Sequence, residues 1–175
     1  MLTTKDRVKR ALAIDIGSND SLLEDIIKSV SKMVEDYCNR IFIYGEYTEI
    51  FDGDGRDIIF LKGFPVREIK SIKLDGVDIT DDCKVNKELG EIYYQKGFSE
   101  GFQNIEVIYT CGYDASNNDY LPPDDLEQAV VEEVVSRFEN LTTQTRTGEN
   151  LVDLRTNFLT GRARDYFSRQ RNINV

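Results

Sequence analysis

The chain has 175 residues, of which 40% are hydrophobic and 31% charged, and this suits one domain with a modest core and at most an additional arm. Its 22 Lys and Arg against 32 Asp and Glu give a formal charge of -10, which argues against a duplex-binding protein held by cationic contacts to phosphates. No run approaches the roughly 18 consecutive apolar residues of a transmembrane helix, and the polar start of the chain lacks the apolar segment of a signal peptide, so we expect a protein of the cytoplasm that needs no membrane.

The charge is unevenly distributed along the chain. Residues 1–140 carry 16 Lys and Arg against 29 Asp and Glu, a net charge of -13. Residues 141–175 carry six arginines, no lysine and three acidic residues, a net charge of +3. An acidic body followed by an arginine-rich tail indicates different roles for the two parts, because arginine is the cation favoured at protein interfaces.

The first 40 residues are expected to be helical. A short helix is predicted over 4–12 and a longer one over 20–40. In the longer segment the apolar residues recur at the spacing of an amphipathic helix: Leu22, Leu23, Ile26, Ile27, Val30, Met33, Val34, Tyr37, Cys38 and Ile41. Ser18 or Ser21 is the expected N-cap, and Ser21 with Glu24 has the spacing of a capping box.

Residues 46–112 change to a pattern of strands and turns. Five short segments rich in β-branched or aromatic residues are the predicted strands: Tyr47–Phe51, Ile58–Leu61, Ile69–Asp75, Glu91–Tyr94 and Ile105–Thr110. Glycine-containing turns separate them, among them residues 52–57 and Asp75-Gly76. The pattern predicts a small antiparallel sheet inserted between helices.

The last third of the chain begins with a strong helix start. Pro122-Pro123 and the acids that follow predict a helix over 123–141. Residues 142–160 have no helical periodicity and are predicted to be a loop, and a last helix is expected from about Gly161 to Asn172. The predicted fold is therefore α+β: a bundle of about three to four helices with the inserted sheet, in one domain over 1–140, and a loop and C-terminal arm helix over 141–175.

Few residues in the sequence suggest catalysis or cofactor binding. The chain has no histidine, which removes the commonest general base, and its three cysteines (Cys38, Cys83 and Cys111) lack metal-ligand spacing. The run Asp52-Gly53-Asp54-Gly55 superficially suggests a calcium loop, but the twelfth position, where a calcium loop closes with Glu, is Gly63. We expect a hairpin turn at 52–57, no cofactor, no metal site, and a protein that is not an enzyme.

The tail allows two interpretations. Its arginines are compatible with a solvated helix face that needs no partner. They are also compatible with a binding arm, because aromatic residues are interleaved with them as in binding hot spots. We favour the binding arm, because the tail follows a long loop and its charge is opposite in sign to that of the body. The residues of this candidate arm are Arg162, Arg164, Tyr166, Phe167, Arg169 and Arg171.

The order of several segments resembles a known family. The long amphipathic helix over 20–40 ends near Tyr37-Cys38-Asn39-Arg40. Four segments follow it at characteristic spacing: Tyr47–Gly55, Phe64–Ile72, Val107–Tyr113 and Leu121–Ala129. This layout, over about residues 18–140, is similar to that of the phage head–tail connector proteins, also called adaptors or head completion proteins.

The resemblance implies a structural virion protein in the head–tail neck of a tailed phage or prophage, assembled in the cytoplasm of the bacterial host. Members form a ring of about twelve copies under the portal protein, extend the channel through which genomic DNA passes, and dock the next neck, stopper or tail protein. Their C-terminal segments commonly attach to the portal, which gives the arm residues above a portal-binding role. The loop is expected to order against a neighbouring subunit, through Thr142, Thr145, Arg146, Leu151, Leu154 and Phe158.

Two alternatives stay open. One is another neck or tail-completion ring protein. The other is a DNA-binding packaging accessory that uses the arginine tail on DNA, with a steep dependence of affinity on salt.

Overall fold

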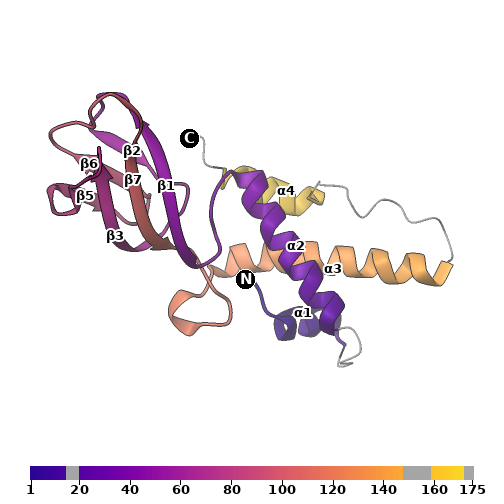
Figure 1. Ribbon diagram of the computed structural model, residues 1–175. Coiled ribbons are helices and arrows are strands. Elements are labelled where there is room, and N and C mark those ends of the chain that lie inside the picture. Colours follow the sequence, from indigo (N-terminus) through magenta and orange to yellow (C-terminus); the bar gives the residue numbers. More distant parts are fainter. Residues whose placement is uncertain (15–19, 148–158, 172–175) are drawn as a thin grey trace. The chain divides into compact units, whose positions relative to one another are not determined.

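The computed structural model describes residues 1–14, 20–147 and 159–171, and it divides into two compact units (Figure 1). A helical unit comprises Met1–Cys38 together with Tyr113–Arg171, and a sheet unit comprises Asn39–Gly112. The α+β prediction is confirmed, because the strands form one continuous insertion between two helical segments.

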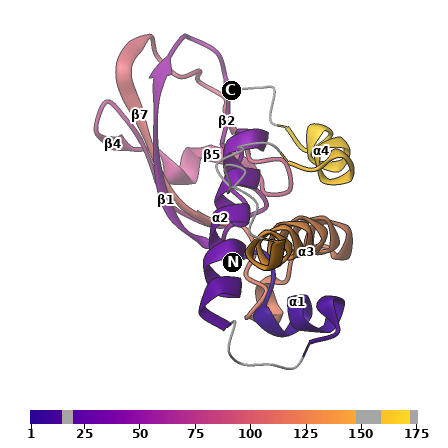
Figure 2. The same ribbon diagram turned by 90° about the vertical axis from the view of Figure 1, so that its right-hand side faces the viewer.

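Four α-helices form the described part of the helical unit: α1 (Lys5–Leu12), α2 (Asp20–Cys38), α3 (Asp124–Thr147) and α4 (Gly161–Ser168). Helix α3 contacts each of the other three, and Figure 2 shows α4 lying beside it. The buried faces of α2 and α3 supply most of the core, whose fully buried members include Leu23, Ile27, Val30, Val34, Val130, Val131 and Val134. The amphipathic spacing in the sequence therefore marks the packed faces.

The start of α1 follows the usual chemistry of a helix N-terminus. Thr4 is its N-cap, and the Thr4 hydroxyl oxygen accepts a hydrogen bond from the backbone N–H of Arg7 at 3.3 Å. The capping box predicted for α2 is wrong, because Ser21 lies inside that helix, whose first residue is Asp20. Asp20 instead forms an ion pair with Lys9 of α1 at 2.5 Å.

The predicted loop at 142–147 is also wrong. Helix α3 continues to Thr147, six residues beyond the predicted end. The Thr142 hydroxyl donates to the backbone carbonyls of Phe138 (3.0 Å) and Glu139 (3.1 Å), so this polar side chain bonds back to its own helix. The helix therefore persists through a polar run that has no apolar periodicity.

The sheet unit contains two sheets rather than the single one predicted. The first has the strand order β1-β7-β3-β4, with β1 (Gly45–Gly53), β7 (Gly101–Cys111), β3 (Val66–Leu74) and β4 (Val77–Asp78). The second has the order β2-β6-β5, with β2 (Ile58–Phe60), β6 (Glu91–Tyr94) and β5 (Cys83–Asn86). Strand pairing is antiparallel throughout both sheets.

A shared apolar core joins the two sheets. Its fully buried members come from both, among them Ile72, Ile105, Val107 and Tyr109 from the first and Ile92 from the second. The turn at 52–57 is not the predicted hairpin, because β1 pairs with β7 and β2 pairs with β6, so this turn carries the chain from one sheet to the other. The predicted turn at Asp75-Gly76 is confirmed: it joins β3 to β4 as a hairpin, with positive φ at both residues.

Candidate functional site

The C-terminal segment 159–171 packs on the helical unit as an integral element. Its apolar residues are buried against the unit: Leu159, Ala163 and, with no exposed surface, Phe167. Ala163 and Phe167 lie four residues apart on one face of α4, Leu159 lies just before the helix, and α4 contacts both α2 and α3. The segment is thus held by hydrophobic packing at one helix face.

A buried carboxylate fixes the start of this segment. Glu133 of α3 is 1% exposed, and one of its carboxylate oxygens accepts the backbone N–H of Thr160 at 2.8 Å and the Thr160 hydroxyl at 2.7 Å. The other oxygen accepts the Nε–H of Arg137 at 2.7 Å. Because each carboxylate oxygen is hydrogen-bonded and a cation is adjacent, the charge is tolerated in the core.

The far end of the segment has weaker anchors. The Cys38 thiol at the end of α2 donates toward the carbonyl oxygen of Phe167 at 3.5 Å. The Arg171 guanidinium lies over the ring of Tyr37, with 5.6 Å between the guanidinium carbon and the ring centroid. The half-buried ring of Tyr166 meets that of Phe167 edge to face at 5.2 Å. The segment is therefore tied at both ends, most firmly at Thr160.

The basic residues of the tail lie in α4 and just beyond its end at Ser168. Arg164, Arg169 and Arg171 are exposed, whereas the side chain of Arg162 lies outside the described residues. The predicted arm residues thus divide into an exposed cationic group and an aromatic group that is buried or half-buried within the subunit. Their role in binding the portal stays a prediction.

The residues predicted for an inter-subunit loop are divided as well. Thr142, Thr145 and Arg146 lie in α3, while Leu151, Leu154 and Phe158 lie outside the described residues. The prediction that this segment contacts a neighbouring subunit remains a prediction.

Sequence reasoning did not identify Glu133. A signal was present, because Glu133 falls on the same face of α3 as Leu126, Val130 and Arg137 at helical spacing, and a charged residue on a buried helix face needs a partner. Its partner Thr160 is 27 residues away. A local sequence pattern can therefore indicate that Glu133 needs a partner, but it cannot identify Thr160 as that partner.

A second polar network lies in the sheet unit. The hydroxyl of the fully buried Tyr109 accepts the N–H of Gly63 at 3.0 Å and donates to the carboxylate of Glu49, which also accepts the N–H of Lys62 at 3.0 Å. Burial, and then the hydrogen bond to Glu49, raise the pKa of Tyr109 far above its usual value. The hydroxyl stays protonated, so this network is structural.

The carboxylates that superficially suggested a calcium loop accept hydrogen bonds from backbone N–H groups. Asp54 accepts the backbone N–H of Arg56 at 3.1 Å, and Asp52 accepts the N–H of Gln103 at 2.6 Å. Within residues 1–14, 20–147 and 159–171, no group of three or more Cys, Asp or Glu side chains is arranged to hold a metal ion. Over the same residues, none of the helices is both long and apolar enough to cross a membrane.

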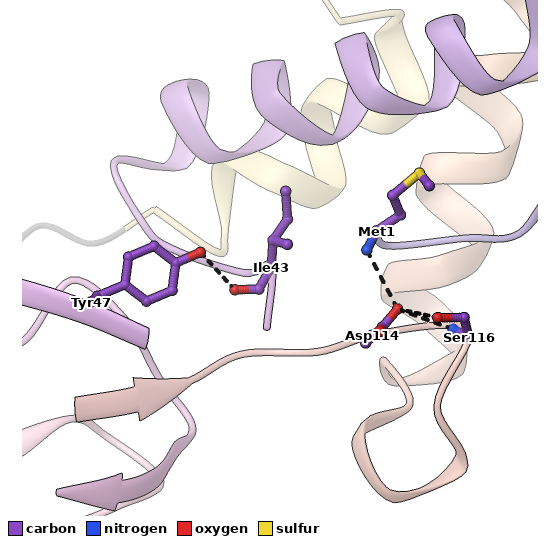
Figure 3. A network of polar contacts seen from close by, with 5 residues as sticks. All are labelled: Met1, Ile43, Tyr47, Asp114 and Ser116. Carbon is purple, nitrogen blue, oxygen red and sulfur yellow. Dashed lines mark hydrogen bonds and ion pairs between the residues drawn. The ribbon is translucent and has the colours of Figure 1, made fainter. Parts of the chain in front are cut away.

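Smaller polar contacts order the connections within each unit (Figure 3). In the helical unit, one carboxylate oxygen of Asp114 accepts the Ser116 hydroxyl at 2.8 Å and lies 3.5 Å from the amino group of Met1. In the sheet unit, the Tyr47 hydroxyl donates to the carbonyl of Ile43 at 2.9 Å. These contacts fix the start and the end of connecting segments rather than forming a site.

Comparisons with known proteins place these features in a family context. A family model described as head completion protein matches residues 1–156. A search among curated proteins gives no significant match. The match to the family covers the whole sheet unit and α1 to α3.

Solved structures with the same fold come from gene transfer agent particles. One is the neck of an empty gene transfer agent particle computed with C6 symmetry, at 17% identity and a TM-score of 0.63, with 91% of this chain and 82% of that chain covered. Another is the neck of the native particle computed with C12 symmetry, at 14% identity and a TM-score of 0.60, with coverages of 89% and 85%. A third, the virion of the native particle, matches at 15% identity and a TM-score of 0.60, with coverages of 91% and 81%.

Proposed function

This chain belongs to the head completion protein family, and from that membership we propose that it is a head–tail connector, an adaptor subunit in the neck of a tailed phage, a prophage or a related particle. The observation that carries the proposal is the family match over residues 1–156, which spans both compact units. The role is structural rather than enzymatic, in keeping with a chain that has no histidine.

The proposed assembly is a closed ring. Two solved structures of the same fold are necks computed with C6 and C12 symmetry, which supports a ring of six-fold or twelve-fold symmetry for this chain. A ring is built from heterologous interfaces, in which one patch of each subunit meets a different patch of the next. The acidic body, with a net charge of -13 over residues 1–140, suits a channel wall that repels DNA and lets it pass.

The proposed partners are the portal above the ring and the next neck or tail protein below it. We assign the portal contact to the C-terminal segment, because its exposed arginines differ in sign from the body and lie beside aromatic residues. Arginine with aromatic side chains is the composition that dominates binding energy at interfaces.

The test is reconstitution with the portal of the same particle. Full-length subunits, a truncation lacking residues 160–175, and a control lacking only residues 172–175 are mixed with portal rings and examined by mass photometry and negative-stain imaging. The full-length chain and the control should form rings on the portal, and the longer truncation should bind more weakly. Undiminished binding by the longer truncation would overturn the assignment to the C-terminal segment. Failure of every form to bind the portal or to form a ring would overturn the connector role itself.

The second candidate is a DNA-binding packaging accessory, and the exposed Arg164, Arg169 and Arg171 are the observation that favours it. Binding of duplex DNA that weakens steeply with salt, and that is lost when these three arginines become glutamine, would support it. Binding that is absent at 50 mM salt would exclude it.

A further inference from the structure

The docked position of α4 conceals the apolar surface that a portal-binding segment would use. Phe167 has no exposed surface, and Leu159 and Ala163 are also buried in the helical unit. An interaction helix commonly lays such a stripe, with anchors three or four residues apart, into a groove of its partner. In the isolated subunit these apolar residues already pack in the helical unit, where α4 contacts α2 and α3 of the same subunit.

The contact at Thr160 is specific enough to hold the helix in place. Thr160 is the N-cap residue of α4, and its own side chain makes no capping hydrogen bond. The Thr160 N–H and hydroxyl both donate to Glu133 instead. If α4 leaves, Glu133 keeps only Arg137 among these partners, and a buried carboxylate that loses hydrogen bonds is unfavourable. The pair therefore opposes release.

We propose that Glu133 and Thr160 form a latch that holds α4 on its own subunit, and that the portal captures the released segment through the apolar stripe of Ala163 and Phe167 together with Leu159 just before the helix. This inference rests on the proposed function of the C-terminal segment and adds how that segment is regulated. The partner surface it fits is an apolar groove with an acidic rim, because exposed arginines at 164, 169 and 171 flank the stripe.

The latch lowers the apparent affinity of the subunit for the portal by a predictable amount. When only a fraction of subunits has α4 released, the apparent affinity for the portal is reduced by that fraction. Weakening the latch raises the fraction, so portal binding becomes tighter although no portal contact is altered. A variant that loses one of the hydrogen bonds to Glu133 should bind roughly 3-fold to 10-fold more tightly, the effect of a single hydrogen bond.

Two variants weaken the latch, one by changing the hydrogen-bond acceptor and the other by changing the donor. Glu133→Gln removes the charge from the acceptor, and Thr160→Val removes the hydroxyl while keeping the size of the side chain. Glu132→Gln is the matched control, because Glu132 is the exposed neighbour in the same helix. Hydrogen exchange of the amides of residues 161–168 and the affinity for portal rings are measured for all forms of the full chain.

The latch predicts faster exchange in α4 and tighter portal binding for both variants, with Glu132→Gln unchanged. Unchanged exchange in both variants, or weaker portal binding by Thr160→Val, would overturn it, since weaker binding means that docked α4 is the binding form. If Glu133→Gln disrupts the helical unit as a whole, Thr160→Val still decides, because its change lies outside the core of α2 and α3. Failure of the proposed function is distinguishable: it appears as undiminished portal binding when residues 160–175 are removed.

Discussion

Two glutamates connect distant parts of the chain through the same pattern of hydrogen bonds. In the helical unit, Glu133 accepts the backbone N–H and the side-chain hydroxyl of Thr160. In the sheet unit, Glu49 accepts the backbone N–H of Lys62 and the side-chain hydroxyl of Tyr109. In both cases the hydroxyl belongs to a residue at least 27 positions away. Glu133 is buried, and a buried carboxylate is tolerated only when it is hydrogen-bonded, so Glu133 favours the arrangement that keeps Thr160 beside it. Glu49 is half-buried, and its hydrogen bonds link β1 to Lys62 and to Tyr109 of β7.

The thiol of Cys83 permits a test of the structure at a single residue. Cys38 and Cys111 are fully buried, whereas Cys83 on β5 is partly exposed. Burial, and then the nearby Asp82 and Asp78, raise the pKa of the Cys83 thiol to about 11. Because only the thiolate reacts, alkylation of the native protein should be slow at pH 8 and should rise about tenfold per pH unit through pH 10. A rate that levels off near pH 9 would contradict the raised pKa, and Cys83→Ser should abolish the reaction.

The same shift contributes to stability with a definite sign. The Cys83 thiol has its ordinary pKa of 9.0 in the unfolded chain and a pKa of about 11 in the folded state. The folded state therefore keeps this proton up to a higher pH. Over that window the unfolded state binds fewer protons, so the free energy of unfolding decreases as the pH rises. The contribution of Cys83 to the free energy of unfolding is fully present below pH 9 and is lost between about pH 9 and 11.

At the scale of elements, the end of α1 is strained at one residue. Ala13 adopts the left-handed conformation with φ of 52°, and the N–H of the following Ile14 bonds to the carbonyl of Lys9 at 3.1 Å. Glycine adopts this conformation without the penalty of a Cβ atom. Ala13→Gly should therefore raise the free energy of unfolding by about 0.5–1 kcal/mol.

The matched comparison is Ala11→Gly, two residues earlier and inside the helix. Ala11 is exposed, so its replacement changes backbone freedom rather than packing, and it should lower the free energy of unfolding by about 1 kcal/mol. Thermal or urea denaturation measures both variants. Destabilisation of similar size in both would show that Ala13 does not occupy the left-handed conformation in solution.

Elements with a regular apolar period could be predicted from the sequence, and those defined by their partners could not. The faces of α2 and α3 and the strand β6 were predictable because burial leaves its period in the residues. Strand β4 is two residues long, which is too short for a period to show. Strand β5 is as long as β6 but has only one β-branched or aromatic residue, Val85, where β6 has three. Whether the described strands form one sheet or two depends on long-range pairing, which no local pattern reveals.

The candidate site was predictable only in part for the same reason. Arginine and aromatic residues in the tail are visible as composition, so Arg164 and Phe167 could be selected from the sequence. That Phe167 is buried in its own subunit while Arg164 is exposed depends on contacts with α2 and α3. Those contacts join segments more than 100 residues apart, such as Cys38 and Phe167.

At the scale of the whole molecule, the sheet unit has the properties of an independent inserted domain. Its core consists of its own residues, with Leu61, Ile72 and Val107 among those fully buried. Its two ends are tied within the unit: the Ile41 N–H donates to the carbonyl of Lys62 at 2.9 Å, and the Gly112 N–H donates to that of Pro65 at 3.1 Å. An insertion closed in this way can evolve and fold as a module.

Residues 39–112 expressed alone should therefore fold. A domain of this size has a small core, so we expect a free energy of unfolding of about 3–5 kcal/mol, with a single cooperative transition by circular dichroism. The matched control begins at residue 58 and lacks β1, the long strand that covers one edge of β7. Because β7 would then expose an unpaired apolar edge, the control should aggregate or remain unfolded. If residues 39–112 show no cooperative transition while the full chain does, the sheet unit depends on the helical unit and is not a domain in its own right.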